Sequence, residues 1–160
     1  MDKLERGLRW ITGILNGHRI PFQLTGGLAA HAYGATRPIH DIDLDIPEDR
    51  FDDILDEVRP YIILSPKHYR DKVWDLKLMT LNYLGQEIDL GGAYATRILD
   101  EKTGEWHDCR ADLAATRPMT VAGVTVPVVD KRELIEYKSW LALPGDHQEQ
   151  DVREIRAAAI

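Results

Sequence analysis

Two stretches in the first third of the chain decide the fold: Thr25-Gly26-Gly27 and, after thirteen intervening residues, Asp41-Ile42-Asp43-Leu44-Asp45-Ile46. The second stretch alternates strictly between acidic and apolar residues, which predicts a β-strand. Side chains along a strand point alternately to opposite faces, so Asp41, Asp43 and Asp45 share one face while the apolar residues face the core. Carboxylates about 7 Å apart on one face repel one another. This face is therefore either a solvated edge or a site for a divalent cation.

The glycine pair precedes a run of small residues over 28–33, which predicts a tightly packed helix closed by Gly34. A plain turn explains most glycine pairs. The specific signal is the combination of a glycine pair, a short helix and an acidic strand in that order.

Known acidic motifs fit the strand to different degrees. A calcium-binding EF-hand needs glycine at its sixth position and glutamate at its twelfth, where this chain has Ile46 and Asp52. An aspartyl nucleophile of the phosphatase type would follow a buried apolar strand, but Arg37-Pro38-Ile39-His40 precedes Asp41. The Asp-x-Asp of metal-dependent sugar transferases stays open as an alternative, although such domains usually need a longer chain.

The order Gly26-Gly27, helix, Asp41-Ile42-Asp43-Leu44 resembles the signature of the polymerase-β-like nucleotidyltransferase superfamily. The small size and the position of Arg37 most resemble its stand-alone antibiotic-type members, the lincosamide nucleotidyltransferases among them. This resemblance implies a third carboxylate on a later strand, and Asp89 in Glu87-Ile88-Asp89-Leu90 occupies the right kind of place. It also implies an α+β nucleotidyltransferase fold, with a mixed sheet flanked by helices and closing helices over about 130–160.

The same resemblance implies that Asp41, Asp43 and Asp89 hold two Mg²⁺ ions and that Asp89 also takes the proton of the acceptor. Nucleotidyl transfer needs the phosphate charge offset and the acceptor oxygen placed in line with the leaving pyrophosphate. Two metal ions held between carboxylates do both. The implied substrate is a nucleoside triphosphate (NTP) such as ATP.

Four further residues are implied in nucleotide binding. Gly26 and Gly27 would let backbone N–H groups approach the phosphates at the start of a helix. Lys138 resembles a lysine that contacts the triphosphate, although a lysine on a helix flank is as often solvated. Arg37 either contacts phosphate or pairs with a carboxylate.

Length and composition predict one globular domain over 1–160. Lys and Arg total 20 against 27 for Asp and Glu, giving a net charge of −7, which argues against duplex nucleic acid as the main partner. Cys109 is the only cysteine, so no intramolecular disulfide is expected, and we interpret it and His107 as ordinary core and surface residues. The N-terminal MDKLERGLRW does not resemble a signal peptide, and no long apolar run suggests a membrane partner. We therefore expect a cytoplasmic protein.

Periodicity and turn residues predict the other elements. Helices are expected over 2–16, 48–58, 131–143 and 146–160, and strands over 18–24, 74–84, 87–90, 118–121 and 124–129.

The function that these features favour is a metal-dependent nucleotidyltransferase, which moves a nucleoside monophosphate from an NTP to a hydroxyl of a small molecule or protein. A catalytically silent nucleotidyltransferase-like binding protein, of the toxin and antitoxin type, and a sugar transferase stay open as alternatives. In a chain of 160 residues, one small sheet must hold the metal site, the nucleotide and the acceptor, so few residues are left to line an acceptor pocket. We therefore expect a homodimer in which a second copy of the chain completes that pocket.

Overall fold

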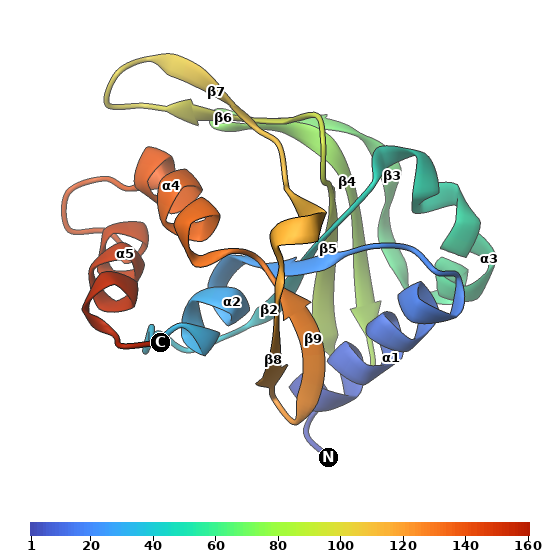
Figure 1. The fold of residues 1–160 in the computed structure, drawn as a ribbon. Coiled ribbons are helices and arrows are strands. Elements are labelled where there is room, and N and C mark those ends of the chain that lie inside the picture. Colours follow the sequence, from blue (N-terminus) through green and yellow to red (C-terminus); the bar gives the residue numbers. More distant parts are fainter.

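A nine-stranded mixed sheet forms the centre of the protein in a computed structural model that describes residues 1–160 (Figure 1). The strand order is β7-β6-β4-β5-β2-β1-β9-β8, and β3 pairs with β4 beside this path. The predicted α+β class with a mixed sheet is therefore confirmed. The strands are β1 (Gln23–Thr25), β2 (Asp41–Ile46), β3 (Ile62–Arg70), β4 (Trp74–Tyr83), β5 (Gln86–Gly92), β6 (Thr96–Asp100), β7 (Glu105–Cys109), β8 (Arg117–Val121) and β9 (Val124–Val128).

Helices α4 and α5 lie side by side at one end of the molecule, and α1 lies at the other (Figure 1). Short 3₁₀ segments complete the connections between the elements. The helices are α1 (Lys3–Gly17), α2 (Gly26–Ala32), α3 (Leu55–Val58), α4 (Lys131–Leu141) and α5 (His147–Ala157), and the 3₁₀ segments are η1 (Glu48–Ile54), η2 (Arg59–Tyr61) and η3 (Leu113–Ala115).

Strand β2 has the bounds that its alternation predicts, and its apolar face is buried. Ile42, Leu44 and Ile46 are at most 1% exposed and belong to a core cluster of 30 residues. The strand pairs antiparallel with β1 and parallel with β5. Because both neighbours flank β2 directly, the acidic face of β2 lies in the middle of the sheet and not at a solvated edge.

Several predicted elements differ from the structure. The strand predicted over 18–24 is confined to Gln23–Thr25, because the chain turns through Arg19 at a φ of 56° after α1. The helix predicted over 48–58 is mostly 3₁₀, with a single α-helical turn at Leu55–Val58.

Three strands, β3, β6 and β7, were not predicted. Strand β3 contains Pro66 and polar residues, and its pairing with β4 has two register shifts, so it lacks a clean period of two. Strands β6 and β7 form a hairpin that reaches out beside α4 (Figure 1).

A lysine in the β6–β7 turn holds the C-terminal end of α4. Lys102 Nζ donates to the backbone oxygens of Ser139 at 3.0 Å, Trp140 at 3.2 Å and Ala142 at 2.7 Å. These carbonyls have no partner within the helix, and a cation there also complements the helix dipole. The ring of His107 on β7 stacks on Trp140, with 4.4 Å between ring centroids. The hairpin therefore fixes the end of the helix that carries Tyr137 and Lys138.

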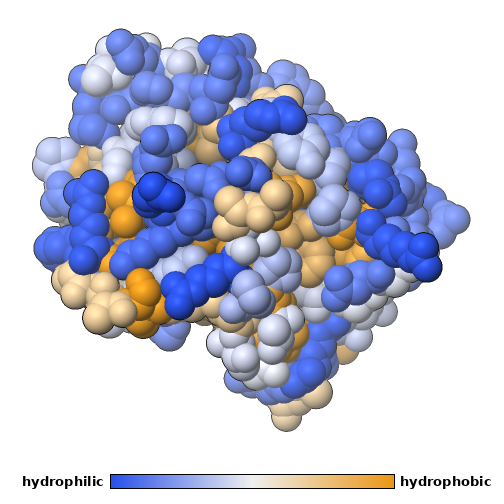
Figure 2. Space-filling view, viewed as in Figure 1, coloured by the Kyte–Doolittle hydropathy of each residue, from blue (hydrophilic) through white to orange (hydrophobic).

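No helix has both the length and the apolar composition needed to cross a bilayer. Figure 2 shows hydrophilic residues over most of the face drawn, with smaller apolar areas among them.

Replacing Lys102 with methionine should lower the free energy of unfolding by about 1 kcal/mol, because three carbonyl groups lose their donor and Asp100 loses its ion pair, while the aliphatic stem is kept. Urea denaturation followed by circular dichroism measures the change. Lys72→Met is the matched control, since Lys72 is 79% exposed and pairs only with Glu101, and it should leave the midpoint unchanged. Equal midpoints for the two variants would show that the cap contributes nothing.

Candidate active site

The structure brings the three predicted carboxylates together. Asp41 and Asp43 lie on β2 and Asp89 on β5, and one carboxylate oxygen from each lies within 4.8 Å of the others. The parallel register places Asp43 directly beside Asp89, so the side chains project from the same face of the sheet. All three are partly buried.

Burial and mutual repulsion make this cluster electrostatically unfavourable by itself. Burial, followed by the charges of Asp41 and Asp89, raises the pKa of Asp43 well above its usual range. Burial also raises the pKa of Asp89, and a hydrogen bond from Thr80 Oγ1 to Asp89 Oδ1, 2.6 Å long, opposes that shift. Carboxylate oxygens are the ligands that Mg²⁺ prefers, and a cation would relieve the repulsion. The donor set therefore fits a divalent metal.

Gly26 is required at the start of α2 for two reasons. Its φ of +66° is a conformation that favours glycine, and a Cβ at this position would overlap the Asp43 carboxylate. Its N–H donates to Tyr137 Oη at 2.8 Å, and the same hydroxyl lies 2.9 Å from Thr25 Oγ1. The Gly26 N–H, which sequence reasoning assigned to phosphate, is thus bonded within the protein, while a Cβ built on Gly27 would lie 3.9 Å from Arg37 Nη2.

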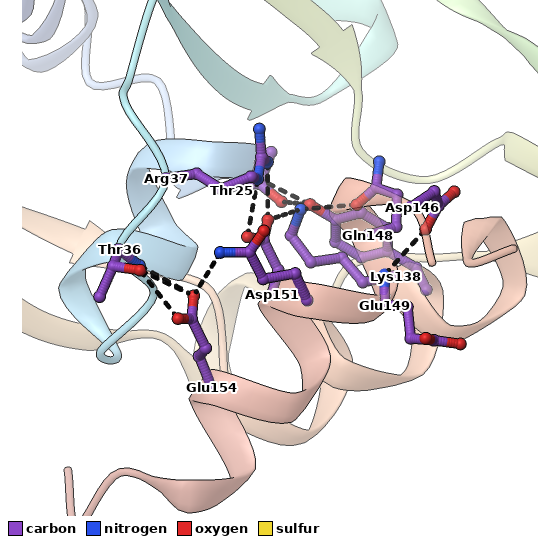
Figure 3. Close-up of polar contacts among 12 residues, drawn as sticks. Thr25, Thr36, Arg37, Lys138, Asp146, Gln148, Glu149, Asp151 and Glu154 are labelled. Atoms are coloured by element: carbon purple, nitrogen blue, oxygen red, sulfur yellow. Dashed lines mark hydrogen bonds and ion pairs between the residues drawn. The ribbon is translucent and has the colours of Figure 1, made fainter. Parts of the chain in front are cut away.

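Arg37 and Lys138 share one carboxylate that the sequence did not reveal (Figure 3). Arg37 donates through Nε and Nη2 to the two oxygens of Asp151, at 2.8 and 2.7 Å. Lys138 Nζ donates to Asp151 Oδ2 at 3.0 Å and to Gln148 Oε1 at 2.8 Å. Lys138 is only 2% exposed and so is not the solvated lysine of the alternative interpretation. A detectable signal existed, because Gln148 and Asp151 interrupt the buried stripe that Val152 and Ile155 continue along α5.

One cavity of about 380 Å³ joins these groups. Its polar lining contains the three carboxylates, the glycine pair and both cations, and its apolar lining comes largely from β4 and α4. The apolar wall includes Trp74, Leu76 and Leu78 on β4 and Leu141 on α4. The cavity thus combines an acidic floor, a cationic side and an apolar wall.

Cys109 lines this cavity, but its surroundings disfavour a thiolate. Burial raises the pKa of the Cys109 thiol to about 12, so the thiol stays protonated at neutral pH. The ring of His107 stacks on Trp140. Both residues are thus partly buried, Cys109 in the cavity wall and His107 against Trp140.

Asp45, the third acidic residue of β2, lies outside the cluster of three. Gln23 Nε2 donates to Asp45 Oδ2 at 2.9 Å, and burial raises the pKa of Asp45 to about 7. The other amide atom, Gln23 Oε1, is buried without a hydrogen-bond partner. Burial thus disfavours the charge on Asp45, and an uncharged amide at position 45 would keep an acceptor for Gln23 Nε2 without that charge.

We expect Asp45→Asn to stabilise the metal-free protein at pH 8 by up to about 4 kcal/mol, with little change at pH 4. An unfolded aspartate has a pKa of about 3.9, so between pH 4 and 7 the folded protein binds more protons than the unfolded chain. Stability of the wild type should therefore fall as the pH rises through this range, and the variant should lack this component. Urea denaturation in EDTA across pH 4–8 measures it, with the exposed Asp49→Asn as control. Parallel profiles for wild type and Asp45→Asn would contradict the assignment.

No protein-family model matches this sequence, and no curated protein matches it. Solved structures do match. A candidate nucleotidyltransferase from Thermotoga maritima superposes with a TM-score of 0.67 at 24% identity, covering 88% of this chain and 86% of that one.

Two antibiotic-modifying proteins are also similar in structure. The lincosamide antibiotic adenylyltransferase LnuA, bound to lincomycin, has a TM-score of 0.61 at 12% identity and covers 98% of both chains. ANT(2")-Ia in complex with adenylyl-2"-tobramycin has a TM-score of 0.60 at 19% identity, covering 96% of this chain and 88% of that one. The resemblance drawn from Gly26-Gly27 and the acidic strand is thus confirmed in three dimensions, and the chain has the nucleotidyltransferase fold.

Proposed function

We propose that this protein is a metal-dependent nucleotidyltransferase, which transfers a nucleoside monophosphate from an NTP to a hydroxyl group of a small molecule or protein. The observation that carries the proposal is the cluster of Asp41, Asp43 and Asp89, whose oxygens lie within 4.8 Å of one another in the same cavity as Arg37 and Lys138. Paired carboxylates next to confined cations suit a polyphosphate that arrives with divalent metal.

Asp41, Asp43 and Asp89 would hold the metal, with Mg²⁺ as the proposed ion and two ions as the proposed number. When bound, the metal would offset phosphate charge and orient the reacting groups. The raised pKa of Asp43 and the oxygen-only donor set support this assignment. The net charge of −7 is compatible with it, because the nucleotide enters as a magnesium complex.

Asp89 is the proposed base. Thr80 Oγ1 fixes Asp89 Oδ1 and leaves the second oxygen to accept the proton of the acceptor hydroxyl. The hydroxyl oxygen forms its bond to the α-phosphorus as the bond to pyrophosphate breaks. In the metal-free protein, burial raises the pKa of Asp89, which favours uptake of a proton.

Arg37 and Lys138 are the proposed triphosphate-binding cations, and Gly27 is the proposed backbone contact. The guanidinium Nη2 lies 3.9 Å from the position that a Cβ would take on Gly27, so the two face the same space. Arginine is suited to phosphate because its planar fork can donate two parallel hydrogen bonds.

The acceptor is proposed to be a small molecule with an apolar part. The wall of Trp74, Leu76 and Leu78 supports an apolar contact. The solved relatives that bind lincomycin and adenylyl-2"-tobramycin support a small-molecule acceptor in preference to a silent binding protein or a sugar transferase.

We also propose that the protein is a homodimer in which a second copy of the chain completes the acceptor pocket. Light scattering would test this proposal by measuring the mass in solution.

The function is tested by incubating the protein with each labelled NTP and a panel of hydroxyl-bearing acceptors, read by mass shift of the acceptor. We expect thermal stabilisation by NTP with Mg²⁺ and much less with NTP and EDTA, because the carboxylates repel phosphate without a metal.

Asp43→Asn should abolish transfer while leaving the protein folded, since neutralising one carboxylate relieves repulsion. Stabilisation that is the same with EDTA, or near-normal transfer by Asp43→Asn, would refute the metal-dependent mechanism.

The role of Asp89 is tested by comparing Asp89→Ala with Asp41→Ala. A base acts in the transition state, so Asp89→Ala should lower turnover by about 10²-fold or more and keep the affinity for the Mg²⁺ complex of the NTP within a few fold. Asp41→Ala should weaken nucleotide binding as well. Calorimetric titration and turnover measured on the same preparations separate the two effects. Equal losses of affinity would make Asp89 a metal ligand only.

A further inference from the structure

Asp151 is a buried carboxylate whose hydrogen bonds all come from the two proposed phosphate-binding cations (Figure 3). It lies on α5, and its side chain is 1% exposed. Arg37 comes from the loop before β2, and Lys138 comes from α4. One side chain therefore joins three segments that are distant in the sequence.

This arrangement leaves both cations with donors to spare. Two of the five N–H donors of Arg37 bond Asp151, which leaves three, and the Arg37 side chain, which lines the cavity, is 27% exposed. Two of the three donors of Lys138 bond Asp151 and Gln148, which leaves one. Asp151 thus fixes the direction of both groups without exhausting either.

The charges also favour this arrangement. Burial lowers the pKa of Lys138, whereas the Asp151 charge and its hydrogen bond raise it. Without Asp151, the nearly inaccessible Lys138 ammonium would stand beside the Arg37 guanidinium with no hydrogen-bonded carboxylate, and only the charges of the other acidic side chains, such as Asp43 and Asp41, would offset their repulsion. The trio retains one net positive charge and two oriented donor groups.

A second contact docks α5 on the same loop without touching either cation. Glu154, one turn further along α5, accepts hydrogen bonds from Thr36 N at 3.1 Å and from Thr36 Oγ1 at 2.8 Å. Docking of α5 and orientation of the cations can therefore be perturbed separately.

We propose that Asp151 is a positioning residue for the triphosphate: it holds Arg37 and Lys138 in one orientation and thereby links the docking of α5 to phosphate binding. This inference rests on the proposed assignment of the two cations to phosphate. It makes α5 part of the nucleotide site, although Asp151 lies behind the two cations and does not line the cavity.

The test is calorimetric titration of wild type and variants with Mg²⁺ tripolyphosphate and with Mg²⁺ ATP, at a temperature where circular dichroism shows every variant folded. Asp151→Asn should weaken binding of both probes by about tenfold, as expected for the loss of charged hydrogen bonds that orient the donors. Glu154→Gln is the matched control, since it loosens the docking of α5 but leaves the cations in place, and it should bind within about twofold of wild type. Unchanged or tighter binding by Asp151→Asn would overturn the inference, because a carboxylate that only repelled phosphate would give that result. Equal weakening in both variants would assign the effect to docking alone and would likewise overturn it.

A double variant identifies the route of the effect. If Asp151 acts through Arg37, the affinity losses of Arg37→Gln and Asp151→Asn should combine less than additively in the double variant. Full additivity would mean that Asp151 acts by a route independent of Arg37 and would overturn the proposed orientation of that side chain.

A reciprocal measurement uses only the wild type and so does not depend on the folding of any variant. Linkage requires that a ligand which gains from α5 docking also strengthens that docking. Mg²⁺ tripolyphosphate should therefore slow hydrogen exchange of backbone amides in 147–157. Binding without protection of this segment would overturn the linkage.

The outcomes also separate this inference from the proposed function. Wild type that binds tripolyphosphate in an Asp151-dependent way but transfers no nucleotide would refute the transferase and leave the inference standing. Active transfer with no effect of Asp151→Asn on binding would refute the inference alone. Wild type that binds neither probe would refute both.

Discussion

The crowding of like charges on one face of β2 and β5 is the constraint to which the surrounding structure responds. Two carboxylates about 4 Å apart repel by about 4 kcal/mol at an effective dielectric constant of 20. The opposite face of the same strands is apolar and fully buried at Ile42, Leu44, Ile88 and Leu90. Burying each such side chain contributes about 1.5–3 kcal/mol, which is enough in combination to hold the acidic face in place. The register that buries the apolar residues also brings Asp43 beside Asp89, so the core fixes the site.

The positive charge near this face is limited and already shared. The cavity contains Arg37 and Lys138, and Asp151 neutralises one of these two charges. Against the three clustered carboxylates, the remaining charge cannot make the cavity positive. A free triphosphate would meet net repulsion, whereas a magnesium complex would supply the missing charge itself. The electrostatics thus favour entry of metal and nucleotide together.

The sequence was most informative where one local pattern and the tertiary structure agree. Strand β2 has the predicted bounds because strict alternation matches a sheet with one buried face. Strand β3 lacks that alternation because Pro66 and the register shifts interrupt it. The spacing of apolar residues over 48–58 predicts a helix but does not distinguish the 3₁₀ segment η1 from an α-helix. Asp89 could be assigned through the resemblance, but its pairing with Asp43 depends on the sheet register, which no local pattern contains. For Asp151, the pattern along α5 could at most single out a polar residue in a buried stripe, since its partners lie more than ten residues away on other segments.

Helix α4 connects the two halves of the candidate site through adjacent residues. Tyr137 binds the Gly26 N–H, and so fixes the turn that lies against Asp43, while Lys138 points to Asp151 on α5. A rotation of α4 large enough to displace one of these side chains would displace the other, because successive side chains on a helix lie about 100° apart on a rigid backbone. Lys102 holds the C-terminal end of this helix from the β6–β7 hairpin, outside the cluster of carboxylates. The hairpin therefore acts on the site through α4, and the glycine turn and the cation pair depend on the position of that one helix.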